Sequence, residues 1–131
     1  MSNPFFIVAI AGAIGLFFVG FVFLRLRGRK LSGSVQKKLL AQWKSLEQIQ
    51  DDLRRVLEAD SILDSALGAS GYSGSLAEKL KKAGPRFSDL NAVWAAHKLR
   101  NRIAHEPGMR VSKQESDRAV TALRRAFQDL C

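Results

Sequence analysis

Apolar residues form one unbroken run near the start of the chain, from Phe5 to Leu24. These twenty residues include no charged side chain, and a helix of that length spans about 30 Å, the thickness of a bilayer's hydrocarbon core. A cleaved signal peptide would place positive charge before a shorter apolar run, whereas residues 1–4 carry no cationic side chain. The pattern therefore predicts a transmembrane anchor over residues 1–24.

Basic residues follow this run and set the orientation that we expect. Four cations come shortly after it, namely Arg25, Arg27, Arg29 and Lys30. Because cytoplasmic flanks of membrane helices carry an excess of Lys and Arg, the amino terminus should face outward and the rest of the chain should lie in the cytoplasm. A lone Cys131 agrees with a reducing compartment. These features are typical of a single-pass protein of a bacterial inner membrane, with the lipid bilayer as a partner.

After the basic cluster, apolar residues recur three and four positions apart, the spacing of one face of an α-helix. A first stripe runs from Val35 to Leu67, and we expect a kink or break in it near 49–52 or near 60–61. Glycine and serine at 68–74 indicate a loop.

Later helix starts carry their own sequence pattern. Ser75 with Glu78, and Ser112 with Glu115, have the spacing of a capping box, in which side chain and backbone satisfy each other's free groups. A further helix is predicted from Ser88-Asp89 to Pro107-Gly108, where proline and glycine end it.

These patterns predict an all-α protein, since no segment alternates as a strand does. The predicted architecture is a single N-terminal transmembrane helix followed by an up-and-down bundle of about four helices. It divides into the anchor at 1–24, a flexible basic linker at 25–34 and a cytoplasmic bundle at 35–131. The expected core residues are Trp43, Leu53, Trp94, Leu123 and Phe127.

Most of the net charge of +9 lies beside the anchor. Six of the 21 Lys and Arg residues fall between Arg25 and Lys38, a stretch without acids. The other fifteen stand against twelve Asp and Glu residues at 39–131, which leaves +3 for the bundle. Such a basic collar is explained by membrane topology and by attraction to anionic headgroups. The high isoelectric point is therefore poor support for nucleic-acid binding.

Residues 100–105 read Arg-Asn-Arg-Ile-Ala-His and come just before the helix-stopping Pro107. Arginine can neutralise a phosphate through two parallel hydrogen bonds, and histidine transfers protons near neutral pH. Together with a carboxamide, these are groups that can cut RNA without a metal. The order Arg, polar residue, three free positions, His resembles the signature of HEPN domains. These are small helical bundles, many of them metal-independent endoribonucleases.

The resemblance covers roughly residues 40–130 and implies a role for each side chain of the motif. In the implied mechanism, a ribose 2′-hydroxyl closes on the adjacent phosphate and leaves a cyclic phosphate. His105 would be the acid/base group, Arg100 would hold the phosphate, and Asn101 would orient the phosphate or the imidazole. Arg102 would add phosphate affinity. We expect no cofactor and no metal site, because two histidines and one terminal cysteine do not make a ligand set.

Arg100 and His105 do not share one face of a helix, because five residues rotate the chain by about 140°. The resemblance implies a homodimer, in which two motifs face each other across one cleft. His97 is a minor candidate for lining that cleft and is otherwise a core residue. A second class of function stays open: a non-catalytic, membrane-tethered adaptor that assembles with itself or with a cytoplasmic protein. A shared, open, positively charged cleft containing Arg100 and His105 would favour RNA as the partner.

Overall fold

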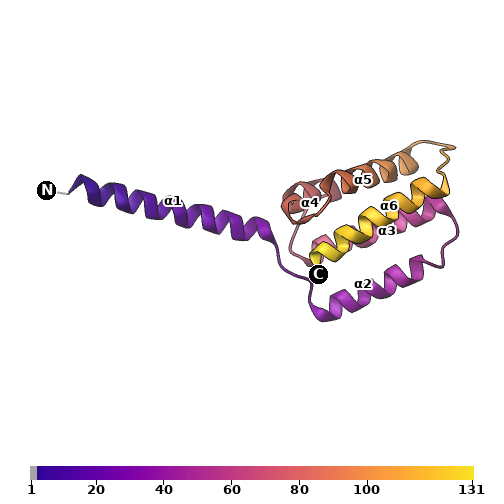
Figure 1. The fold of residues 1–131 in the computed structure, drawn as a ribbon, viewed down its shortest axis with the longest axis horizontal. Coiled ribbons are helices and arrows are strands. Elements are labelled where there is room, and N and C mark those ends of the chain that lie inside the picture. Colours follow the sequence, from indigo (N-terminus) through magenta and orange to yellow (C-terminus); the bar gives the residue numbers. More distant parts are fainter. Residues whose placement is uncertain (1–2) are drawn as a thin grey trace.

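The computed structural model describes residues 3–131, and within 25–27 it describes the backbone alone. Every regular element in this part of the chain is a helix, which confirms the all-α prediction. The first, α1 (Pro4–Arg27), stands away from the other helices as a single rod (Figure 1). Over Pro4–Leu24 it is long and apolar enough to cross a membrane, and none of that segment is buried by the rest of the protein. Two of the expected flanking cations, Arg25 and Arg27, have side chains outside the described part.

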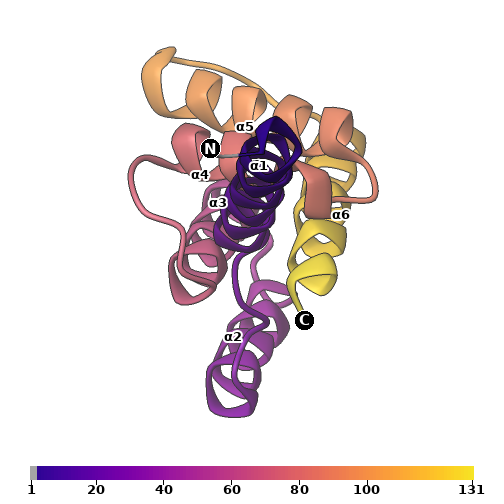
Figure 2. The ribbon, with the colours of Figure 1, turned by 90° about the vertical axis from the view of Figure 1, so that its left-hand side faces the viewer.

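The remaining helices form a bundle that runs up and down. It contains α2 (Gly33–Leu46), α3 (Asp52–Ala69), α4 (Leu76–Ala83), the 3-10 turn η1 (Gly84–Arg86), α5 (Leu90–His105) and α6 (Lys113–Leu130). The central helix is α3, which packs against α2, α4, α5 and α6. The view along α1 shows α2 at one edge of the bundle and α5 at the other (Figure 2). The carboxyl terminus of the chain lies near the end of α1 (Figure 1).

Local sequence accounts for most of the helix ends. Both expected capping boxes are formed: the Ser75 hydroxyl accepts from the Glu78 amide, and the Ser112 hydroxyl accepts from the Glu115 amide. The long apolar stripe is broken between α2 and α3, at the first of the two places expected. The side chain of Asp51 caps the first turn of α3.

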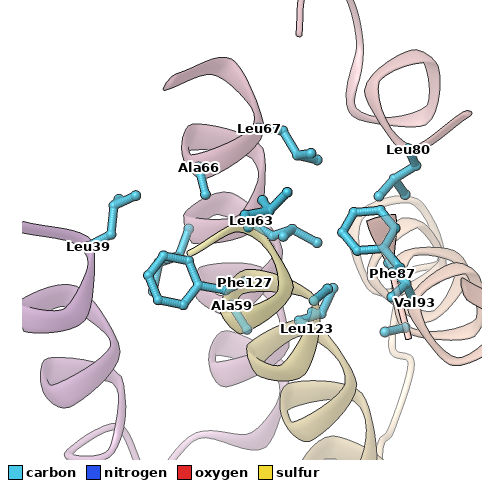
Figure 3. Packing of buried hydrophobic residues seen from close by; sticks show 14 of the residues in the cluster. Leu39, Ala59, Leu63, Ala66, Leu67, Leu80, Phe87, Val93, Leu123 and Phe127 are labelled. Atoms are coloured by element: carbon cyan, nitrogen blue, oxygen red, sulfur yellow. The ribbon is translucent and has the colours of Figure 1, made fainter. Parts of the chain in front are cut away.

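The core lies where α3 and α6 meet, and α2, α4 and α5 cover it (Figure 3). Phe127 packs against Trp43 with ring centroids 5.9 Å apart, and both side chains are fully buried, as is Leu123. Two residues expected in the core are only partly buried, namely Leu53 and Trp94. Both lie at the margin of the apolar stripe of their helix, where periodicity alone does not separate core from rim.

Part of the segment expected to be a flexible linker contacts the bundle, at Gly28 and Leu31. Leu31 is only 7% exposed and belongs to the core, so the packed unit begins before residue 35. Gly28 has a φ of +64°, and a Cβ there would lie 2.6 Å from the Tyr72 hydroxyl. Only glycine fits this position without strain, because φ is positive and the ring approaches closely. The sequence-based expectation missed this contact because Tyr72 lies far along the chain.

Trp43→Ala should lower the free energy of unfolding by about 3–5 kcal/mol, because the indole is 2% exposed and its loss leaves a cavity. Trp94→Ala should cost about 1–3 kcal/mol, because part of its ring already meets solvent. Urea denaturation followed by circular dichroism measures both. The reverse order of the two variants would contradict this placement of the rings.

Candidate functional site

The two leading residues of the motif, Arg100 and Asn101, border an open pocket of about 360 Å³ between α3, the start of α4 and α5. Arg100 follows Val93 and Ala96 by seven and four residues, so the side of α5 that is buried against the core also carries Arg100 to the pocket. The side chains that line the pocket are mostly polar, namely Asp60, Ser61, Asp64, Ser75, His97, Arg100 and Asn101. The pocket therefore suits a small polar or charged group.

A buried carboxylate organises this pocket. Asp60 on α3 is 4% exposed, and its Oδ1 atom lies 3.1 Å from Nδ1 of His97. Its other oxygen, Oδ2, lies 3.3 Å from Nε of Arg100. A buried carboxylate needs such partners, since an unpaired charge in the interior is costly. The same contact that satisfies Asp60 also fixes the guanidinium of Arg100 at the mouth of the pocket.

Asn101 closes the network between the imidazole and the guanidinium. Its Oδ1 accepts a hydrogen bond from Nη1 of Arg100 at 3.2 Å, and its Nδ2 lies 3.4 Å from Nε2 of His97. A neutral imidazole with its proton on Nδ1 satisfies both contacts of His97, because Nδ1 then donates to Asp60 and Nε2 accepts from Asn101. The four side chains thus orient one another.

Burial raises the pKa of Asp60 above its ordinary value, although the hydrogen bond from His97 and the charge of Arg100 act in the opposite direction. Removing the carboxylate from water is thus the larger effect. The Arg100 side chain, by contrast, is 37% exposed. It keeps donors available to a ligand while the carboxylate behind it holds its position.

The structure separates His105 from this cluster. His105 is the last residue of α5, is exposed, and does not line the pocket. Arg102 is also exposed, and its Nε lies 3.5 Å from Oε1 of Glu106. Within the chain, therefore, Arg100 and Asn101 lie together, and the third member of the motif lies beyond them at the last residue of α5.

The sequence indicates His97 only as a minor candidate for lining the cleft, and Asp60 was not among the predicted site residues. The sequence did carry a sign of it: Asp60 occupies a position in the apolar stripe of α3, between Val56 and Leu63 at spacings of four and three. A carboxylate at such a position must be buried with partners. Its partner could not be read from the stripe, since His97 lies 37 positions away.

Comparison of the chain with protein-family models, curated proteins and solved structures finds no match. The likeness to HEPN domains therefore rests on residues 100–105 and their helical setting.

Asp60→Ala should lower the free energy of unfolding by about 1–3 kcal/mol, because it leaves the buried His97 without its acceptor. Asp64→Ala is the matched control one turn along α3. Asp64 is about half exposed, although its partner Lys79 is only 13% exposed, and because solvent reaches the carboxylate its removal should cost less, about 0–1 kcal/mol. Thermal and urea denaturation measure both variants. Equal losses would show that Asp60 is not held as described.

Proposed function

We propose that the chain is a single-pass membrane protein whose helical bundle lies in the cytoplasm. The support is the unburied apolar helix α1 together with the cations that follow it. On this proposal the membrane is the inner membrane of a bacterium, and the bundle is held close to its cytoplasmic surface.

We further propose that the bundle is a HEPN-like domain that binds RNA and cleaves it without a metal. The observation that carries this proposal is the position of Arg100: its guanidinium is held from behind by the buried Asp60 and remains partly open to solvent at a polar pocket. A guanidinium prepositioned in this way loses little conformational freedom when it binds a phosphate. Asn101 beside it supplies an amide for the same ligand.

Cleavage on this proposal needs a second subunit. Since Arg100 borders the pocket and the exposed His105 ends the helix, one motif grips the phosphate and the imidazole of another reaches the ribose or the leaving oxygen. His105 would act as the acid/base group, because imidazole is the side chain best suited to proton transfer near neutral pH. Tethering to one membrane favours such dimers by raising the local concentration of subunits.

One observation favours the adaptor function as a second candidate. A mainly apolar groove of about 190 Å³ lies between α5 and α6. Its apolar lining consists of Ala92, Ala95, Ala96, Leu99, Ala119 and Ala122. Small side chains on two neighbouring helices let another helix approach closely, as subunit and partner interfaces require. An inert but dimeric protein would support this reading.

Topology reporters test the membrane proposal. Alkaline phosphatase fused after Cys131 should be inactive in bacterial cells, and a fluorescent protein that folds only in the cytoplasm should be bright at the same position. Carbonate washing should leave the full chain in the membrane fraction. Active phosphatase at this position would reverse the proposed orientation.

RNA cleavage tests the catalytic proposal. The full chain in neutral nanodiscs should cut single-stranded RNA in the presence of EDTA and leave cyclic-phosphate ends. His105→Ala should slow cleavage by at least about 10²-fold, as expected for loss of a general acid or base. Arg100→Ala should cost a similar factor, and Arg100→Lys should restore little, because a point charge does not reproduce the planar fork.

Arg124→Ala is the control for these variants. It removes an exposed arginine that pairs with Glu47 on another face of the bundle, and it should leave cleavage unchanged. Circular dichroism and chemical cross-linking should show that each variant is folded and dimeric. A folded, dimeric wild type that leaves varied RNAs intact would overturn the nuclease proposal and leave the adaptor function.

A further inference from the structure

The end of the bundle nearest α1 carries a group of basic side chains from distant parts of the sequence. We call this group the membrane-proximal face, and it consists of Arg29, Lys30, Lys81, Lys82 and Arg86. The first two belong to the segment after α1, and the others belong to α4 and η1. Helix α4 packs beside α1 near the point where α1 meets the bundle (Figures 1 and 2).

Backbone contacts fix this end of the bundle to the chain that leaves α1. The amide of Arg29 donates to the carbonyl of Ser70 at 2.9 Å, and the amide of Leu31 donates to the carbonyl of Leu130 at 3.4 Å. These bonds join the segment to the last turns of α3 and α6. Because they begin two residues after α1 ends, there is little free chain between the apolar helix and the folded bundle.

Arg86 connects the same segment to η1. Its Nη1 lies 3.5 Å from the carbonyl oxygen of Arg29 and 3.5 Å from the hydroxyl of Tyr72, and its guanidinium lies over the Tyr72 ring, 5.9 Å from the centroid. Arg86 thus holds α4 and η1 beside the exit from α1.

Two lysines of α4 extend the positive charge away from this junction. Leu80 and Ala83 are the buried residues of α4, and Lys81 and Lys82 are exposed. Nζ of Lys82 donates to the carbonyl of Ser73 at 3.3 Å, which keeps its charge near the junction.

The nearby acids are engaged in capping and loop contacts. Glu78 accepts from the backbone of Ser75, Asp89 caps α5, and Asp129 accepts from the amide and hydroxyl of Ser88. Within the described part of the chain, no cation of the membrane-proximal face forms an ion pair with these or other carboxylates.

We propose that the membrane-proximal face docks the folded bundle onto anionic lipid headgroups of the membrane that α1 crosses. This inference rests on the proposed anchoring and not on the nuclease activity. Charge complementarity supports it, since exposed lysines near an anionic surface are attracted within about a Debye length. Continuity also supports it, because the face lies beside the point where the chain leaves α1 and a short, bonded connection holds it there.

Docking in this way gives the bundle a defined orientation. Helix α5 begins beside η1 and runs for 16 residues, so its end lies about 24 Å farther along its axis. His105 and the loop that follows it are then directed away from the lipid. The same arrangement leaves the end of the motif open to the cytoplasm.

The lone Cys131 offers a native position for a probe of docking. It lies one residue beyond Leu130, whose carbonyl is bonded to the segment after α1, and it is partly exposed. The full chain, labelled at Cys131 with a fluorophore, is placed in nanodiscs of phosphatidylcholine with or without phosphatidylglycerol. Because this end of the bundle is bonded to the segment after α1, a headgroup nitroxide lipid quenches the fluorophore in both states, and more strongly when the face lies against the lipid. Hydrogen exchange of 76–86 measures docking independently.

Phosphatidylglycerol should increase quenching and slow exchange of 76–86 in the wild type. K81Q/K82Q should lower the ratio of docked to undocked protein by about 30-fold, which is the loss of two lysines near an anionic surface. The control R110Q/K113Q removes the same charge from exposed positions at the other end of the bundle and should behave as the wild type. Arg86 is kept in both variants, because it also holds the junction.

Equal quenching in the two lipid mixtures, with the chain fully retained in the nanodiscs, would overturn docking and leave anchoring intact. An equal loss in R110Q/K113Q would also overturn it, because total charge and not this face would then be responsible. Protection of 76–86 by an RNA oligonucleotide in neutral nanodiscs, without a response to phosphatidylglycerol, would assign the face to RNA instead. Release of the chain by carbonate would refute the anchoring proposal itself.

Discussion

The burial of one carboxylate organises the candidate site. Asp60 lies among the apolar residues of α3, where an ionised group without partners would be strongly unfavourable. Its two oxygens contact His97 and Arg100, so that a requirement of folding also sets the geometry of α5 at the pocket. Burial raises the pKa of Asp60, and the two partners oppose that effect. Asn101 then links the imidazole and the guanidinium. The cluster therefore combines a structural role with the presentation of one partly exposed cation.

Local sequence predicted the features that local physics determines. Capping boxes, helix-ending prolines and apolar periodicity act over a few residues, and they gave the helical class, the break between α2 and α3, and the starts of α4 and α6. The apolar run at the amino terminus likewise predicted α1. Burial of Trp43 followed from the same periodicity. The partial exposure of Trp94 did not, because it depends on where α5 crosses its neighbours.

Features that depend on distant residues could not be read from the chain. Asp60 and His97 are far apart in sequence, and no short motif relates them. The segment at 25–34 looked flexible because it is rich in glycine, serine and charge. Within it, however, Leu31 is buried in the core, and Gly28 lets the backbone pass close to Tyr72. Composition predicts the flexibility of an isolated segment. Here the backbone of the segment is bonded to Ser70 and Leu130, at the ends of α3 and α6.

The two ends of the bundle have different surroundings, and this bears on both proposals. At one end, backbone bonds from Arg29 and Leu31 tie the bundle to α1, so that end stays near the bilayer whenever α1 spans it. The other end carries His105, and the Arg100 pocket lies between the two. Two subunits anchored in one membrane would stand side by side with these ends in the same direction. Contacts between them would then join lateral faces of the bundle, where Arg100 and the groove between α5 and α6 are found. A shared anchor direction thus restricts the dimers that can form to those in which the α5 helices of the two subunits lie at the same height above the lipid.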